Sequence, residues 1–339
     1  MLKHDTNNCA NYFSCNLQNH REKNKDVCEK PLFYNIQTKL WEVETIKRLV
    51  ALHDNYEPNA AIPELVTHTE IQEEEEFLYY CLETKVMKLL CAFLMKHKLF
   101  KSNLYWKEIF RDIWFGRWSE GSCAFEHIFL GEFKRNKVSG VHNWVFFLLQ
   151  ESREKVDYYG FDKALDFGRT SKGQGRGGIV TTTFGWENGG AWYQKPYSSL
   201  FIGLSPEMEL ALYTLGFFLK PGGIINISLG GSKIDIQTHA FRTRDKTYLS
   251  SAFPRITQRK LQLNEIVSTN VAGNVIFFNR KKGYGFIKIK DCAKKVFVHR
   301  SENAGHKLKP GDFLIFDIKI GLKGHIACHV DQETINEYT

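Results

Sequence analysis

The chain has 339 residues, of which 43% are hydrophobic and 14% aromatic, so it is long enough for two domains and too apolar to be largely disordered. No apolar run reaches the roughly 18 residues that a membrane span requires. The net charge of +8 is concentrated near the C-terminus: residues 272–331 hold 12 Lys and Arg against 5 Asp and Glu, a net charge of +7. A basic module of this kind predicts a polyanionic partner.

The N-terminus is polar and has no apolar segment of the secretory type, and the eight cysteines are scattered along the chain. Together these features predict reduced thiols and an intracellular protein.

The N-terminal third of the chain has helical patterns. Residues 1–30 are polar and poor in aliphatic side chains, which predicts a flexible segment. Apolar spacing then predicts a helix over 35–54. A second helix is expected to begin at a capping box, Thr69–Gln72, and to continue to about residue 98, and a third covers 104–115.

After residue 125, short apolar segments alternate with turn residues, which predicts strands in hairpins. The expected strands are 128–133, 143–151, 156–161, 179–184, 200–203, 224–229 and 246–253. One helix interrupts them over Pro206–Leu219, with Ser205 as its N-cap. The glycine-rich loop 169–178 lacks the Gly-Lys-Ser/Thr ending of a P-loop, so we reject a nucleotide-binding loop there.

Two histidines carry the strongest chemical signal. His127 and His142 each lie in a dense apolar and aromatic segment, and Lys195 follows further along the chain. Two imidazoles and an ammonium can supply a base for a ribose 2′-OH, an acid for the 5′-oxygen leaving group and a cation for the charged transition state. The alternatives, a core role for His127 and a plain surface position for Lys195, stay open at this point.

Four segments, in order, resemble the EndoU family of poly(U)-preferring endoribonucleases. They are Phe125–Glu132, His142–Trp144, Ser199–Leu215 and Ser251–Pro254. The similarity starts near Pro31 and covers about two thirds of the chain. It implies an α+β fold in which N-terminal helices pack beside two antiparallel sheets that flank a cleft. It also implies cleavage of single-stranded RNA at uridines with a 2′,3′-cyclic phosphate product, and stimulation by Mn²⁺.

The matching motifs imply His142 as general base, His127 as general acid and Lys195 as phosphate clamp, although the sequence does not decide which imidazole faces the 2′-OH. Glu126 and Glu132 flank the first histidine, and in an alternating strand both would face away from it. Each could orient an imidazole, help to hold a divalent cation or form a structural ion pair, so no metal ligands can be named.

Two further positions depart from the family pattern. Ser251 stands where the family has threonine and keeps a hydroxyl for a base or phosphate. Phe253 stands where the family commonly has tyrosine, which implies stacking on uracil without a phenol hydrogen bond. The loop Ser119–Cys123 is shorter than in the family and carries Glu120 in place of an arginine, which predicts an altered affinity for RNA.

The C-terminal segments resemble the cold-shock domain, which implies a five-stranded barrel of the OB type. They are Gly273–Asn279, Lys282–Ile287, Val296–His299, Gly311–Asp312 and Lys323–Ala327. The side chains expected to bind unpaired bases and phosphates are Phe277, Phe278, Lys282, Tyr284, Phe286, Phe297, His299 and Arg300. Phe277 replaces the usual tryptophan, and Arg300 replaces an aromatic residue but can also stack.

The predicted organisation is a flexible segment over 1–30, an EndoU-like domain over 31–258, a linker over 259–271, a cold-shock domain over 272–331 and a tail over 332–339. The predicted function is a monomeric endoribonuclease that acts on uridine-containing single-stranded RNA, away from membranes. The competing hypothesis is an RNA-binding or regulatory protein whose nuclease domain is inactive.

Overall fold

The structure is a computed structural model, and it divides into two compact units, Met1–Thr257 and Gln258–Thr339. It describes residues 1–17, 26, 28–99, 106–118, 122–257, 266–290, 295–302, 307–321 and 324–331. The predicted α+β class is confirmed, because the first unit combines helices with antiparallel sheets and the second is a closed five-stranded barrel. No helix in the described part of the chain is both long and apolar enough to cross a membrane.

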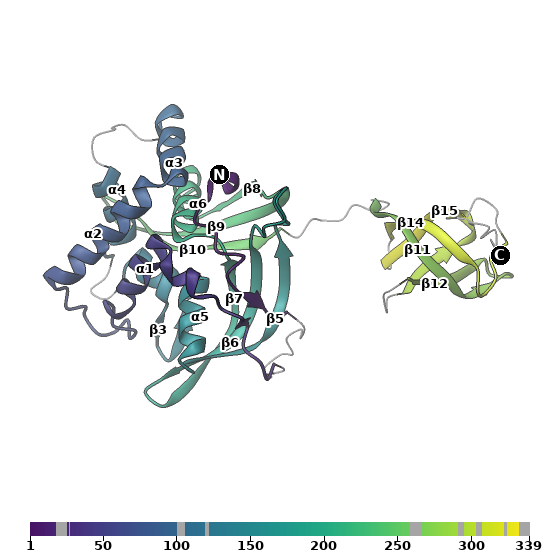
Figure 1. Cartoon of the computed structure of the whole chain (residues 1–339), viewed down its shortest axis with the longest axis horizontal. Helices are drawn as coiled ribbons and strands as arrows, with labels where there is room; N and C mark the ends of the chain where they lie inside the picture. Colours follow the sequence, from purple (N-terminus) through teal and green to yellow (C-terminus); the bar gives the residue numbers. More distant parts are fainter. Residues whose placement is uncertain are drawn as a thin grey trace. The chain divides into compact units, whose positions relative to one another are not determined.

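The first unit gathers helices α1 to α4 on one side and two three-stranded sheets on the other (Figure 1). Its α-helices are α1 (Glu44–Ala51), α2 (His68–Glu83), α3 (Lys85–Lys96), α4 (Trp106–Trp114), α5 (Trp144–Ser152) and α6 (Pro206–Leu219). Short 3-10 turns are η1 (Leu2–His4), η2 (Thr38–Glu42) and η3 (Leu52–Asp54), and η4 (Glu126–Leu130) is a single π-helical turn.

The two larger sheets of this unit are antiparallel, with strand orders β5-β6-β7 and β10-β9-β8. Their strands are β5 (Val156–Asp166), β6 (Gly178–Asn188), β7 (Ala191–Ile202), β8 (Ile224–Leu229), β9 (Ser232–Arg242) and β10 (Thr247–Ile256). Two small two-stranded sheets complete the unit: β1 (Ser14–Cys15) with β2 (Phe33–Tyr34), and β3 (Glu132–Lys134) with β4 (Lys137–Ser139). Strand β9 was not predicted from the sequence.

The N-terminal helices are shorter than expected. The predicted helix over 35–54 is divided into η2, α1 and η3, because Val43 is extended (φ −67°, ψ 120°). The capping box uses Thr67 and Glu70 rather than Thr69, and the helix it starts ends at Glu83. Thr84 is extended and caps α3 by accepting a hydrogen bond from the Met87 N–H, so one predicted helix is two.

Two strand predictions are wrong, the one over 143–151 and, except for residues 132 and 133 of β3, the one over 128–133. Residues 126–130 form the π-helical turn η4, and residues 144–152 form helix α5. Asn143 caps α5, since its side-chain oxygen accepts a hydrogen bond from the Phe146 N–H at 3.0 Å. The error has a physical cause: both segments are buried on nearly all sides, so they lack the polar face whose period separates helix from strand.

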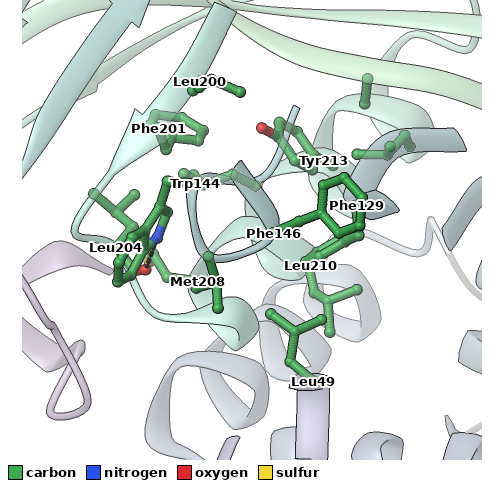
Figure 2. Close-up of a cluster of buried hydrophobic side chains, with 14 of the residues drawn as sticks. Leu49, Phe129, Trp144, Phe146, Leu200, Phe201, Leu204, Met208, Leu210 and Tyr213 are labelled. Carbon is green, nitrogen blue, oxygen red and sulfur yellow. Dashed lines mark hydrogen bonds between the residues drawn. The ribbon is translucent and has the colours of Figure 1, made fainter. Parts of the chain in front are cut away.

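Helix α6 begins and ends where predicted, and Ser205 caps it by accepting a hydrogen bond from the Met208 N–H at 3.2 Å. This helix and α5 both contribute buried side chains to the cluster in Figure 2, among them Trp144, Phe146 and Met208. Trp144 is fully buried there, and its indole N–H donates to the Leu204 carbonyl at 2.8 Å. The start of α5 is therefore held in place directly after His142.

The N-terminal segment differs from the expected flexible chain where it is described. Cys9 is fully buried, and its N–H donates to the Gly203 carbonyl at 2.8 Å. The ring of Phe13 lies 4.9 Å from that of Trp144, between centroids. Residues 1–17 are thus packed onto the first unit, whereas 18–25 and 27 lie outside the described residues.

The second unit has its own core, which includes the fully buried Ile287, Val298 and Leu314. Its strands are β11 (Ile266–Asn279), β12 (Tyr284–Ile289), β13 (Lys295–His299), β14 (Phe313–Gly321) and β15 (Gly324–Asp331), closed in the order β11-β12-β13-β15-β14. Strand β11 starts within the segment predicted as a linker over 259–271. The predicted tail, 332–339, lies outside the described residues.

Asn143 offers a test of how the core holds this region. Its amide caps α5 and also donates to Glu209 at 3.2 Å, and both residues are fully buried. We expect Asn143→Ala to lower the free energy of unfolding by about 2–4 kcal/mol, because it removes a cap and leaves a buried carboxyl with one partner fewer. Urea unfolding followed by tryptophan fluorescence reports the first unit alone, since all seven tryptophans lie in it.

The matched control is Thr67→Ala, which removes the exposed cap of α2. It is expected to cost about 1 kcal/mol. Equal losses for the two variants would contradict the role given to the buried amide.

Candidate active site

The backbone brings His127 and His142 together. The N–H of His142 donates to the Ile128 carbonyl at 2.7 Å, and the N–H of Val141 donates to the His127 carbonyl at 3.2 Å. The two imidazole centroids are 6.5 Å apart. Only glycine fits at Gly140, where φ is +71° and a Cβ would lie 1.7 Å from the His127 carbonyl oxygen. Val141 also has a positive φ of 58°, a strained conformation of a kind that clusters at functional sites.

Lys195 joins the two histidines from strand β7. Its side chain is only 9% exposed, and its charge lowers the pKa of both imidazoles, which places all three groups within electrostatic range of one another. Burial lowers the pKa of Lys195 to about 8, an effect that the nearby Glu132 opposes. The ammonium is therefore charged at neutral pH but close to its titration.

The environment of His142 favours its neutral form. Its Nδ1 lies 3.1 Å from the Ser199 carbonyl oxygen, which can only accept, so Nδ1 carries the hydrogen and Nε2 keeps its lone pair. Burial lowers the pKa of His142 well below its usual value, and Lys195 adds to this effect. A neutral imidazole whose Nε2 has no hydrogen-bond partner among the described residues can take up a proton.

The environment of His127 is different, because its Nδ1 contacts the Glu132 carboxylate at 2.5 Å. Burial opposes ionisation of Glu132, but donors from His127, Lys134 and Ser122 hold its pKa at about 2. Burial lowers the pKa of His127, and the ionised carboxylate counteracts this by favouring the imidazolium. Glu132 thus orients His127, which the sequence left open. The expectation that Glu132 faces away from His127 assumed an alternating strand and is wrong, because His127 lies on a helical turn.

Glu126 does not reach the histidines by any hydrogen bond of the described residues. It is fully buried, and neither carboxyl oxygen has a partner there. Burial and the charge of Glu132 raise the pKa of Glu126 to about 9, so the group is neutral at pH 7. A neutral Glu126 and a Glu132 already bound to three donors do not fit a manganese site, and no described cluster of His, Cys, Asp or Glu could hold a metal.

Strand β10 brings Phe253 to the site. Its ring stacks on His142, with centroids 4.9 Å apart and an interplanar angle of 27°. Ser251 is buried two residues earlier, paired across the sheet with His239. His239, whose ring lies 5.8 Å from that of Phe253, was missed because strand β9 was missed. The sequence signal for strand β9 was the alternation of Ile234, Ile236 and Thr238, which are buried, with residues that are less buried.

Two other predicted features lie apart from these residues. Residues 119–121 of the shortened loop are outside the described chain, so its effect on RNA affinity stays a prediction. The glycine-rich loop 169–178 contacts the N-terminal segment instead, where a cavity of about 690 Å³ is lined in part by Asn8, Asn11 and Arg176.

The barrel presents a row of rings on adjacent strands. Tyr284 pairs with His299 and Phe286 with Phe297 in the β12–β13 register. Tyr284 and Phe297 are stacked at 5.9 Å, and Phe277, 44% exposed, lies 6.1 Å from Tyr284. Exposed and half-buried rings in this arrangement are a platform for unpaired bases.

Three of the predicted barrel residues have other surroundings. Phe278 packs against the barrel core. The Arg300 guanidinium donates to the Lys281 carbonyl at 2.9 Å, so it supports the turn between β11 and β12. Lys282 lies exposed in that turn.

Residues 1–254 match the family model described as Endoribonuclease XendoU. The chain belongs to this family. Residues 271–333 match the model of the "cold-shock" DNA-binding domain, so both resemblances found in the sequence are confirmed.

Similar proteins agree with this assignment. The chain is 34% identical over 239 residues to the uridylate-specific endoribonuclease of Bos taurus, a match that covers 67% of this chain and 55% of that protein. It is 37% identical over 245 residues to the poly(U)-specific endoribonuclease-A of Xenopus laevis, covering 68% and 79%. The chain thus spans only about half the length of the bovine relative.

A solved structure has the same fold. It is titled "The structure of XendoU: a splicing independent snoRNA processing endoribonuclease". It superimposes with a TM-score of 0.60 at 31% identity, covering 75% of this chain and 93% of that one.

Proposed function

We propose that this protein is an endoribonuclease that cuts single-stranded RNA at uridines by internal transesterification and leaves a 2′,3′-cyclic phosphate. The observation that carries the proposal is the pair of imidazoles, 6.5 Å apart, with different partners on Nδ1 and a buried lysine beside them.

The proposed reaction uses each group once. His142 Nε2 takes the proton from the ribose 2′-OH, and the 2′-oxygen attacks the adjacent phosphorus. The Lys195 ammonium stabilises the negative charge that develops on the non-bridging oxygens. In its protonated form, which Glu132 favours against the effect of burial, His127 gives its Nε2 proton to the 5′-oxygen as the phosphorus–oxygen bond breaks.

The preference for uridine is part of the proposal. It is supported by the names of the similar proteins from Bos taurus and Xenopus laevis. It is also supported by Phe253, whose ring stacks on the imidazole of His142, the proposed general base. Phenylalanine can stack on a pyrimidine but offers no hydrogen bond, so recognition of the uracil edge would depend on other groups such as the Ser251 hydroxyl.

Stimulation by Mn²⁺ also stays a proposal. Because Glu132 is occupied by three donors and Glu126 is neutral, we infer that a stimulating ion would be bound chiefly through RNA phosphates. No step of the reaction above depends on it.

The barrel supplies RNA binding that the catalytic unit need not provide. A base that stacks on the platform keeps the attached strand tethered to the same chain and raises its local concentration at the catalytic unit. Under the competing hypothesis, an inactive RNA-binding protein, the barrel would still bind RNA but the first unit would not cleave it.

The decisive experiment uses an oligonucleotide with a single uridine and a matched substrate with 2′-deoxyuridine at that position. We expect the first to be cut, with a 2′,3′-cyclic phosphate end detected by mass spectrometry, and the second to stay intact, because it lacks the attacking hydroxyl. His142→Ala should reduce the rate by about 100- to 10,000-fold.

The matched control for that variant is His68→Ala, an exposed histidine at the start of α2 that should leave the rate unchanged. Cutting of both substrates would refute internal attack. Cutting of neither, with RNA still bound, would favour the inactive protein.

A second prediction separates binding from cleavage. The combined variant Tyr284→Ala and Phe297→Ala removes two stacking rings, each worth roughly 1–3 kcal/mol, so affinity for a long single strand should fall at least about 30-fold. A short substrate at saturating concentration should still be cut at the normal rate. Fluorescence anisotropy and a cleavage assay measure the two properties.

The control here is Tyr79→Ala, which removes an exposed ring, 57% exposed, from helix α2. An equal loss of affinity in this control would show that the barrel rings have no special role.

A further inference from the structure

Lys134 and His127 share one carboxylate oxygen. Glu132 Oε1 lies 2.5 Å from His127 Nδ1 and 2.7 Å from Lys134 Nζ. The side chain of Glu132 is fully buried, whereas that of Lys134 is 45% exposed. An exposed ammonium therefore competes with the proposed general acid for the same negative charge.

The position of Lys134 is set by a tight hairpin. Strands β3 and β4 are joined by Arg135 and Asn136, both with positive φ (51° and 59°), the pattern of a type I′ turn. Lys134 follows Glu132 by two residues on β3, so the two side chains share a face. The register of the hairpin thus places the Lys134 ammonium beside the Glu132 carboxylate. The contact follows from the backbone and not from the choice of one side-chain rotamer.

We propose that Lys134 is a positioning residue for cleavage: it limits how strongly the charge of Glu132 acts on His127, and so sets the fraction of His127 that carries a proton for the leaving group. The inference rests on the proposed function, in which His127 is the acid. It deepens that function by assigning control of the acid to a residue outside the proposed catalytic groups.

The electrostatics agree with this geometry. Burial is the main cause that lowers the pKa of His127, and Glu132 opposes it. Lys134 lowers the pKa of His127 further, and by more than Lys195 does. Lys134 also stabilises the ionised form of the fully buried Glu132, so its charge acts on both members of the His127–Glu132 pair.

The other groups around His127 are few. Lys195 approaches from β7, and His142 approaches from the segment before α5. Strand β10, which also packs against η4, contributes the uncharged Phe253 beside His142. Among the described residues of β3, the charge of Glu132 therefore raises the pKa of His127 and the charge of Lys134 lowers it.

The first test measures His127 directly in the full chain, without RNA. In protein labelled with ¹³C-histidine, NMR titration gives the pKa of His127, with the signal assigned from His127→Asn. We expect Lys134→Met to raise this pKa by about 0.5–1 pH unit, because a nearby positive charge is removed and Glu132 has one donor fewer. Lys134→Arg should restore the original value, because it restores the charge.

The matched control is Lys137→Met. Lys137 is the exposed cross-strand neighbour of Lys134 in the same hairpin and has no ion pair with a carboxylate of the described residues. It should leave the pKa of His127 unchanged. An unchanged or lowered pKa in Lys134→Met, or an equal rise in Lys137→Met, would overturn the inference.

The second test is the pH profile of kcat/KM, whose alkaline limb should move to higher pH by the same amount in Lys134→Met. If the pKa of His127 shifts but the alkaline limb of kcat/KM does not, Lys134 controls the protonation of His127, and His127 is not the acid of the reaction. Because the NMR titration needs no activity, the inference can fail or succeed independently of the nuclease proposal.

Discussion

The close approach of the η4 turn to the segment before α5 is the contact on which the site depends. Two backbone hydrogen bonds, from Val141 and His142 to the carbonyls of His127 and Ile128, hold these segments side by side. The approach is possible because Gly140 has no Cβ, and it imposes a positive φ on the buried Val141. The strain is offset by the core below, where Trp144 anchors the start of α5 to the Leu204 carbonyl.

Burial then separates the chemistry of two identical side chains. Both imidazoles are removed from water, which disfavours the charged form of each. A carbonyl oxygen on Nδ1 leaves His142 neutral, whereas a carboxylate on Nδ1 favours the imidazolium of His127. The same low-dielectric surroundings would strengthen the proposed action of the Lys195 ammonium on a phosphate. One fold thus gives the two imidazoles different partners and places a buried ammonium within electrostatic range of both.

The two units divide the physical tasks differently. The first has a large core of aromatic and aliphatic residues that holds three functional side chains in a narrow arrangement. The barrel has a smaller core and presents the rings of Phe277, Tyr284 and Phe297 outside it, on strands β11 to β13. Stacking tolerates many base sequences, whereas phosphoryl chemistry requires fixed geometry. The large core of the first unit and the exposed rings of the barrel fit these separate requirements.

The sequence by itself determined the family, the fold class and the helix α6, because capping residues, glycines and ordered motifs are local signals that survive without coordinates. The same motifs singled out His127, His142 and Lys195 as candidates. The register of β12 and β13 pairs four of the barrel side chains that the sequence singled out, Tyr284 with His299 and Phe286 with Phe297. Only the tertiary structure decided that His127 lies on a π-helical turn, that Glu132 and not Glu126 contacts it, and that Arg300 supports a turn. Fully buried apolar segments have no polar face to reveal their period, and the partner of a charged side chain depends on contacts between distant parts of the chain.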